Sequence, residues 1–237
     1  MTSKVLIMSH PRCGSSNLLR FINRSNSVPC QSEPFNRRTL DDTLPGWQEM
    51  TTDKVVEHFS NVFADLRVAK HIYGQHPEDL DKHVPLLPDI GAIILLYREN
   101  TAAAALSALI AVKLKNFSGV ADAPLGRIEL DEIKRFSDNF VARRSRAIEH
   151  CKAANAPLMQ ISYETLFGAD EERRKQLDTV LRFMNDNASI PLPSSEKFER
   201  AYAAVLAPEK KINSEKTYQH IENLDEIVAA YPHILSA

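Results

Sequence analysis

Apolar residues occur along this chain as short uninterrupted runs that alternate with stretches of helical periodicity. The runs at 4–8 and 89–97 are continuously apolar, as strands covered on both faces are. Apolar runs predict strands near 4–9, 67–73, 90–97 and 157–163. Apolar residues spaced at i, i+3 and i+4 predict helices near 15–26, 52–66, 101–115, 130–154 and 171–186. This alternation predicts an α/β fold, in which a mainly parallel sheet carries helices on both faces.

The remaining segments, 29–50, 116–127 and 191–214, contain enough Pro, Asn and Ser to predict loops, and no repeat marks a second domain. We therefore expect one domain over 1–237, long enough to bury a sizeable core. No segment is apolar and long enough for a membrane span, and the first residues lack a secretory signal. A cytoplasmic protein is expected.

Charge and cysteine content narrow the classes of function. The net charge of −2 argues against general nucleic-acid binding, because no basic excess is present to neutralise a phosphate backbone. The densest basic cluster, Arg143, Arg144 and Arg146, is interpreted as the solvated face of a helix. Three cysteines without CxxC spacing indicate a reducing compartment, and neither a disulfide framework nor a metal site is expected.

Candidate chemistry is concentrated between the first strand and the first helix, in the segment HPRCGSSNLLRFIN at 10–23. Gly14 allows a ligand to approach the backbone closely, and Ser15 and Ser16 supply hydroxyl groups beside the first amides of the helix. Helix N-termini favour phosphate or sulfate, and Arg12 adds a fixed positive charge. The segment predicts an anion cradle made of Arg12, Cys13, Gly14, Ser15, Ser16 and Asn17.

Two other anion-binding loops are disfavoured by spacing. A nucleoside-triphosphate P-loop has the pattern GxxxxGK[ST], but after Gly14 neither a second glycine nor a Lys-Ser/Thr pair follows. A phosphatase loop has one residue fewer between its cysteine and its arginine than the six that separate Cys13 from Arg20. A kinase-like nucleotide hydrolase and a non-catalytic nucleotide or anion sensor remain as alternatives.

The loop resembles the 5′-phosphosulfate-binding loop of sulfotransferases, P-[KR]-[ST]-G-[ST]-[ST]-x-L. The matching positions are Pro11, Arg12, Gly14, Ser15, Ser16 and Leu18. Cys13 departs from the pattern, because a thiol replaces a hydroxyl group there. The resemblance implies the P-loop nucleotide-hydrolase-like fold of sulfotransferases and the cofactor 3′-phosphoadenosine 5′-phosphosulfate, without a metal.

A second match follows the apolar strand near 90–97. Arg98 stands at its carboxyl end, and Ser107 lies nine residues later in an alanine-rich helix. Similar sulfotransferases hold the 3′-phosphate of the cofactor with an arginine and a serine at this spacing, so the resemblance implies the same role for Arg98 and Ser107. Because ligands of parallel sheets bind at the carboxyl ends of strands, Arg12 and Arg98 are expected to converge.

Two further segments resemble the family less specifically. Residues 162–166 (SYETL) are similar to its [RS]-Y-E-x-L segment, and we expect Glu164 to bond backbone amides outside the site. Residues 221–227 resemble its late I-x-N-x-x-E-[LIV] segment, which follows a basic loop that closes over the nucleotide. By this resemblance, Lys210 and Lys211 are expected to contact phosphate, and a solvated run of charges is the alternative interpretation.

An acceptor hydroxyl benefits from a general base within hydrogen-bond reach. Bacterial carbohydrate sulfotransferases of the trehalose and nodulation-factor type, which this layout resembles, have a glutamate beside an aromatic residue shortly after the first helix. The resemblance assigns Glu33 as the base and, through a K-[LIH]-x-[YW] segment, Lys70 as a residue near the transferred sulfuryl group. His71 is the second candidate for the base, because the strand near 67–73 would place it near the same sheet edge. With Arg12, these residues form the predicted catalytic set.

The sequence therefore predicts a sulfotransferase that acts on a hydroxyl of a carbohydrate or glycolipid acceptor. Phe35 and Trp47 are expected either to stack on a sugar or to form an oligomer contact, and the pattern does not separate these roles. Homo-oligomer formation stays open, and the identity of the acceptor depends on loops that periodicity does not define.

Overall fold

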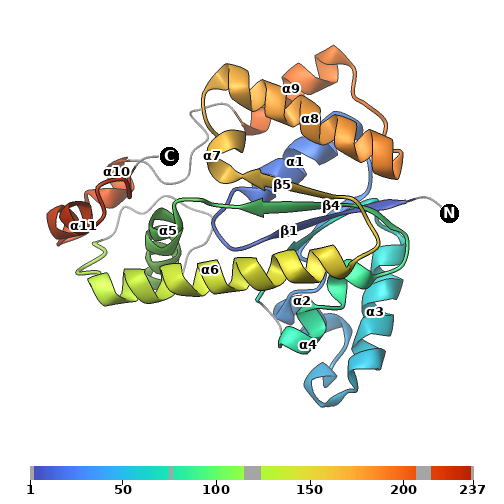
Figure 1. Ribbon diagram of the computed structural model, residues 1–237, viewed down its shortest axis with the longest axis horizontal. Coiled ribbons are helices and arrows are strands. Elements are labelled where there is room, and N and C mark those ends of the chain that lie inside the picture. Colours follow the sequence, from blue (N-terminus) through green and yellow to red (C-terminus); the bar gives the residue numbers. More distant parts are fainter. Residues whose placement is uncertain (1–2, 75–76, 115–123, 207–214, 236–237) are drawn as a thin grey trace.

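The computed structural model describes residues 3–74, 77–114, 124–206 and 215–235 (Figure 1). At its centre lies a five-stranded sheet in the order β2-β3-β1-β4-β5, in which all neighbouring strands are parallel. The strands are β1 (Lys4–Ser9), β2 (Cys30–Ser32), β3 (Val68–Ile72), β4 (Ile90–Tyr97) and β5 (Leu158–Ser162).

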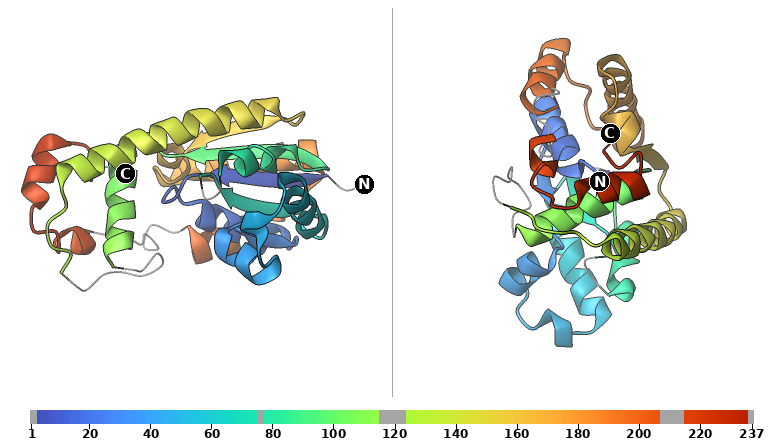
Figure 2. Two further views of the ribbon diagram at one scale, coloured as in Figure 1. Left: turned by 90° about the horizontal axis from the view of Figure 1, so that it is seen from below. Right: turned by 90° about the vertical axis from the view of Figure 1, so that its left-hand side faces the viewer.

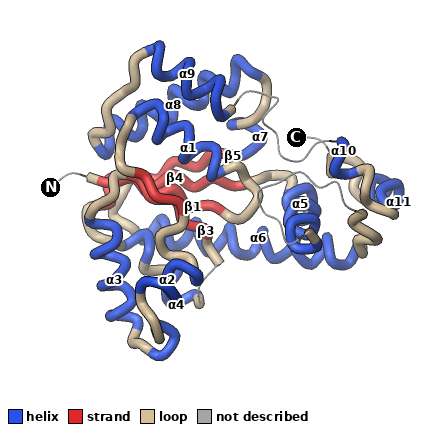
Figure 3. The backbone as a smooth tube through the Cα atoms, turned by 180° about the vertical axis from the view of Figure 1, so that it is seen from behind, coloured by secondary structure: helices blue, strands red, loops and turns tan. Residues whose placement is uncertain are grey.

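Helices surround the central strands (Figure 3). They are α1 (Ser15–Asn26), α2 (Arg37–Thr43), α3 (Thr52–Ala64), α4 (Glu78–Asp81), α5 (Thr101–Lys113), α6 (Leu130–Ala153), α7 (Tyr163–Leu166), α8 (Asp170–Ala188), α9 (Ser195–Val205), α10 (Glu215–Tyr218) and α11 (Leu224–Ala230), with short 3-10 turns at η1 (Trp47–Glu49) and η2 (Val84–Leu86). Among the described helices, none combines the length and the apolarity that crossing a membrane requires.

The two faces of the sheet carry alternate residues of the same strands. In β1, Val5 and Ile7 belong to an apolar cluster with α1, α8 and α9, whereas Leu6 and Met8 belong to one with α3 and the end of α6. All of β1 is buried, which explains why its apolar run has no polar break. The predicted α/β fold class, with a parallel sheet and helices on both faces, is confirmed (Figure 1).

A third apolar cluster lies beyond the carboxyl ends of the strands and joins α5, the first half of α6 and α11. From this cluster α6 runs back along one face of the sheet (Figure 2). Helix α5 is buried from Ala103 to Ala111 without a solvent-facing stripe, because its small side chains allow neighbours to pack closely on all sides.

Nine predicted elements are present within a few residues of their expected bounds, and β1, β4 and α1 coincide with them. The loop prediction is wrong in part for 29–50, which contains β2 and α2, and for 191–214, which contains α9. Short elements with few apolar residues give only a weak periodic signal. For the site, the important feature is register: Ser9 pairs with Ile72 and with Leu96, so β1, β3 and β4 end at one level.

Candidate functional site

The first loop turns sharply between β1 and α1. Gly14 is the N-cap of α1 with a φ of 76°, and a Cβ there would lie 2.3 Å from Cε2 of Phe167. Arg12 also has a positive φ, 67°, which costs a non-glycine residue about 1–3 kcal/mol and is concentrated at functional sites. Ser9 Oγ donates to Ser15 Oγ (2.8 Å) and ties the strand to the helix start. The N-cap residue, Gly14, has no side chain to cap the helix, so within the described part of the chain the amides of Ser15 and Ser16 are available to an anion.

Two arginines from distant parts of the chain meet beside this loop. Arg12 Nε donates to Ser107 Oγ on α5 (3.0 Å), although 95 residues separate the two. Burial lowers the pKa of Arg12, and the positive charge of Arg98 lowers it further. We call Arg12, Arg98 and Ser107 the arginine side of the site. Because its two cations repel each other, this side favours binding of an anion.

Arg98 follows β4 directly and is only 6% exposed. Its guanidinium carbon lies 4.5 Å from the ring centre of Tyr163. Glu164 Oε1 lies 3.7 Å from Arg98 Nε, which is too long for a hydrogen bond, and Nε has no hydrogen-bond partner among the described residues. A buried donor without a partner is costly, so the geometry fits a ligand with anionic oxygens.

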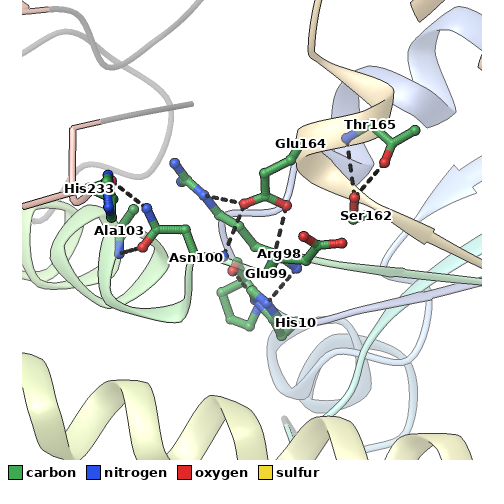
Figure 4. A network of polar contacts seen from close by, with 10 residues as sticks. His10, Arg98, Glu99, Asn100, Ala103, Ser162, Glu164, Thr165 and His233 are labelled. Atoms are coloured by element: carbon green, nitrogen blue, oxygen red, sulfur yellow. Dashed lines mark hydrogen bonds and ion pairs between the residues drawn. The ribbon is translucent and has the colours of Figure 1, made fainter. Parts of the chain in front are cut away.

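Glu164 supports the backbone, as expected (Figure 4). Its Oε2 accepts from the amide of Glu99 (2.9 Å) and its Oε1 from the amide of Asn100 (3.1 Å). Asn100 is the N-cap of α5, and its side chain accepts from the amide of Ala103 (3.0 Å). Glu164 thus fixes the start of the helix that carries Ser107.

His10 connects the first loop to the end of β4, and the sequence analysis did not identify it. The amide of Arg98 donates to His10 Nε2 (3.2 Å), so the ring proton resides on Nδ1 and is donated to the carbonyl of Pro11 (2.6 Å). The ring stacks on Phe140 at 4.7 Å and meets Tyr73 edge-on at 6.1 Å. Burial lowers the pKa of His10 to about 4. A neutral imidazole therefore positions the Arg98 backbone.

Lys70 reaches the other side of the cradle from β3. Its ammonium donates to Ser16 Oγ (2.9 Å) and to Glu33 Oε1 (2.6 Å), and its side chain is only 2% exposed. The Glu33 amide donates to the Lys70 carbonyl (2.8 Å), and Glu33 has a positive φ of 52°. We call Lys70, Glu33 and Ser16 the lysine side. The structure thus brings two of the predicted catalytic residues together at the start of α1.

His71 does not reach the cradle. Successive strand residues point to opposite faces, so His71 faces away from α1, which Lys70 contacts. His71 Nε2 donates to Asp81 Oδ1 (2.9 Å), and the ring is fully buried near Phe35. His71, the second candidate for the base, therefore does not line the cradle, whereas Glu33, the first candidate, lies beside Lys70 at the start of α1.

The Cys13 side chain also lies outside the cradle. Its thiol donates to the carbonyl of His10 (2.8 Å), and burial raises its pKa to about 12. Only the backbone of Cys13 is therefore left to contact an anion. Arg20 lies exposed on α1, so the pair that a phosphatase loop requires is not assembled.

The remaining residues that the sequence analysis named differ in how far they are buried and in whether the structure describes them. Asn17 is half-buried in the first turn of α1. Phe35 is fully buried and Trp47 is 6% exposed, so the expectation that they stack on a sugar or form an oligomer contact is wrong. Lys210 and Lys211 lie outside the described residues. Within the described ranges, no three His, Cys, Asp or Glu side chains are grouped as a metal site needs.

Searches for relatives by sequence gave no match to a protein-family model and none to a curated protein. Solved structures with a similar arrangement include the sulfotransferase domain from the curacin biosynthetic pathway, at 15% identity over 98% of both chains with a TM-score of 0.47. Mouse sulfotransferase SULT7A1 complexed with PAP is 14% identical over 94% of this chain and 73% of its own, with a TM-score of 0.49. A candidate kinase from Chloroflexus aurantiacus is 10% identical over 79% of this chain and 99% of its own, with a TM-score of 0.45. These values describe a distant likeness in architecture, and the functional argument rests on the site.

Proposed function

We propose that this chain is a sulfotransferase that transfers the sulfuryl group of 3′-phosphoadenosine 5′-phosphosulfate to a hydroxyl of a carbohydrate or glycolipid. The observation that carries the proposal is the hydrogen bond between Arg12 and Ser107. It joins the anion cradle to the pair, Arg98 and Ser107, whose spacing resembles a 3′-phosphate site. A ligand with two separate anionic groups suits that junction.

The donor nucleotide carries a 5′-phosphosulfate and a 3′-phosphate, and the described residues offer a matching set of hydrogen-bond donors. The first amides of α1, with Ser15 and Ser16, would hold the 5′ side. Arg98 and Ser107 would hold the 3′-phosphate, and the buried Nε of Arg98 would gain the partner that it lacks within the described part of the chain. Arg12 adds a second positive charge.

The bound donor supplies an activated sulfuryl group and leaves as adenosine 3′,5′-bisphosphate when its sulfur–oxygen bond to the phosphate breaks. Glu33 accepts the proton of the acceptor hydroxyl while the oxygen of that hydroxyl forms its bond to sulfur. A carboxylate accepts several hydrogen bonds, so Glu33 can do this while Lys70 holds its Oε1 at 2.6 Å. Lys70 and the α1 amides stabilise the negative charge that develops on the leaving oxygen.

Calorimetric titration with adenosine 3′,5′-bisphosphate, beside ATP with Mg²⁺, tests the donor assignment. We expect the bisphosphate to bind in preference to ATP and without a metal. Arg98→Ala should weaken binding about 10- to 150-fold, because a hydrogen bond to a charged group contributes about 1.5–3 kcal/mol. Arg20→Ala, which removes an exposed arginine of α1, is the matched control and should bind normally. A preference for Mg²⁺–ATP would support the kinase-like alternative and contradict the proposal.

Sulfate transfer to a set of sugars separates catalysis from binding alone. Glu33→Gln should lower turnover about 10²- to 10⁴-fold, the usual contribution of a general base, and should keep bisphosphate affinity within about twofold. If the wild-type chain binds the bisphosphate but transfers no sulfate to any acceptor, it is a non-catalytic sensor.

A further inference from the structure

A buried arginine lies behind the cradle, near the start of α8, and belongs to neither of its two sides. Arg173 is the fourth residue of α8 and is only 4% exposed. A cation near the N-terminus of a helix opposes the helix dipole, and removing a charge from water adds a further cost. Local helix formation therefore does not explain an arginine at this position, and its contacts do.

The guanidinium of Arg173 joins two segments of the chain. Nη2 donates to the carbonyls of Gly168 (2.8 Å) and Phe167 (3.3 Å), in the turn between α7 and α8. Nη1 donates to the carbonyl of Leu206 (2.6 Å), directly after α9, and to the hydroxyl of Tyr202 (3.3 Å) within α9. The planar fork of donors thus holds the turn and the end of α9 in one relative position.

The turn that Arg173 holds lies against the cradle. A Cβ on Gly14, the N-cap of α1, would lie 2.3 Å from Cε2 of Phe167, so the Phe167 ring packs directly on the cradle glycine. The centre of the same ring lies 4.7 Å from that of Tyr163, whose ring carries the guanidinium of Arg98. Displacement of the Phe167 ring would therefore release Gly14 and weaken the aromatic support of Arg98 together.

The other segment that Arg173 holds also contacts α1. Helix α9 packs along α1 on the face of the sheet that α8 covers (Figure 1). Within that contact, the rings of Phe21 and Phe198 meet edge-on at 5.3 Å. Helix α1 is thus supported at its N-terminus by the turn and along its length by α9, and Arg173 is hydrogen-bonded to both supports.

We propose that Arg173 is a positioning residue of the anion cradle, which holds Phe167 against Gly14 and so preorganises the first amides of α1 for the 5′-phosphosulfate of the donor. The inference rests on the proposed function, because it takes the cradle as the donor site. The four Nη–H donors of Arg173 are all used within the chain, so the residue acts through Phe167 and not by contact with the ligand. Without Arg173, anion binding must also order the loop, which lowers the affinity while every ligand contact is retained.

Calorimetric titration with adenosine 3′,5′-bisphosphate measures the effect on the donor site. Arg173→Met should weaken binding about tenfold, the size expected when a loop must be ordered on binding. Arg174→Met is the matched control, because it removes the next arginine of α8, whose hydrogen bonds go to Asp170 and Glu199, and it should change the affinity less than about twofold. Equal affinity of wild type and Arg173→Met, or an equal loss in both variants, would overturn the proposal.

Two further variants separate positioning from a purely structural or electrostatic role. Arg173→Lys keeps the charge but replaces the fork by a single ammonium, so it should bind as weakly as Arg173→Met, and it supplies the comparison if the Met variant does not fold. Phe167→Leu should weaken binding about tenfold, and adding Arg173→Met should weaken it less than about twofold further, because both changes act on one contact. Normal affinity of Arg173→Lys, or additive losses in the double variant, would overturn the proposal. Thermal unfolding confirms that each variant is folded at the titration temperature.

Inorganic phosphate, followed by ³¹P NMR, distinguishes failure of this inference from failure of the proposed function. It probes the cradle without the nucleotide, and its affinity should fall about tenfold in Arg173→Met and stay unchanged in Arg174→Met. If wild type binds phosphate in this pattern but does not bind the bisphosphate, the donor assignment fails and the positioning role stands. If Arg173→Met binds the bisphosphate as well as wild type does, the positioning role fails and the donor assignment stands. Binding of neither probe by the wild-type chain would contradict both.

Discussion

Both sides of the anion cradle carry buried positive charge, but the charges are compensated differently. On the lysine side, the buried ammonium of Lys70 meets Glu33 at 2.6 Å and Ser16 at 2.9 Å, so its charge is compensated within the chain. On the arginine side, burial lowers the pKa of Arg12 and the charge of Arg98 adds to this effect, and a buried nitrogen of Arg98 has no hydrogen bond among the described residues. The lysine ammonium is thus hydrogen-bonded within the chain, whereas on the arginine side Glu164 lies 3.7 Å from Arg98 Nε and leaves that nitrogen without a hydrogen bond among the described residues.

The largest effect that we expect concerns His10, which accepts the Arg98 amide. Burial lowers the pKa of His10 from 6.5 to about 4, so the folded chain holds the neutral ring. The stability that this shift contributes is fully present above pH 6.5 and is lost as the pH falls toward 4. The total loss in the free energy of unfolding is about 3 kcal/mol. Urea unfolding at a series of pH values between 7 and 4 measures this loss.

His10→Asn is the variant that tests this assignment, because its side chain does not titrate in the same range. The free energy of unfolding of the variant should fall less steeply with acidification than that of wild type. Between the two pKa values of His10, the variant should take up about one proton fewer on unfolding. An identical pH dependence in both proteins would show that His10 does not control the acid stability of the arginine side.

A double-mutant cycle on the lysine side should show the next largest effect. Lys70→Met leaves Glu33 without its buried partner, and Glu33→Gln removes the carboxylate charge. We expect a favourable coupling of about 1–3 kcal/mol in the free energy of unfolding without ligand, since the pair is in direct contact and largely shielded from solvent. A coupling near zero would mean that the charge of Lys70 is not compensated by Glu33.

The parts of the fold that could be read from the sequence are those in which burial leaves no polar break. Strands β1 and β4 are covered on both faces, so their apolar runs mark their bounds. β2 is three residues long and half-buried, and among the described strands it pairs with β3 alone, at the sheet edge. α9 follows Pro191 and Pro193, and charged residues dilute its apolar stripe. In both cases tertiary contacts, and not local pattern, stabilise the element.

The same limit applies to the site. Arg98 and Ser107 were detectable because a fixed spacing connects them along the chain. Lys70 and His71 are neighbours in β3, and the choice between them depends on which face of the sheet α1 covers. His10 stands immediately before the recognised loop, but its role depends on the distant Arg98 amide and on the ring stacked above it, which no spacing encodes.

The smallest effect is the one that most sharply separates the two sides. A cycle with Arg12→Gln and Arg98→Met should give a coupling of opposite sign to the Lys70–Glu33 cycle, about 0.5–1 kcal/mol, because each substitution relieves repulsion of the other arginine. Arg12→Lys, which retains the charge, is the control. Saturating adenosine 3′,5′-bisphosphate should abolish or reverse the sign, because the bound anion places both cations in attractive contacts. If the two cycles share a sign in the absence of ligand, the arginine side is also compensated within the chain, and its need for an anion is not the basis of binding.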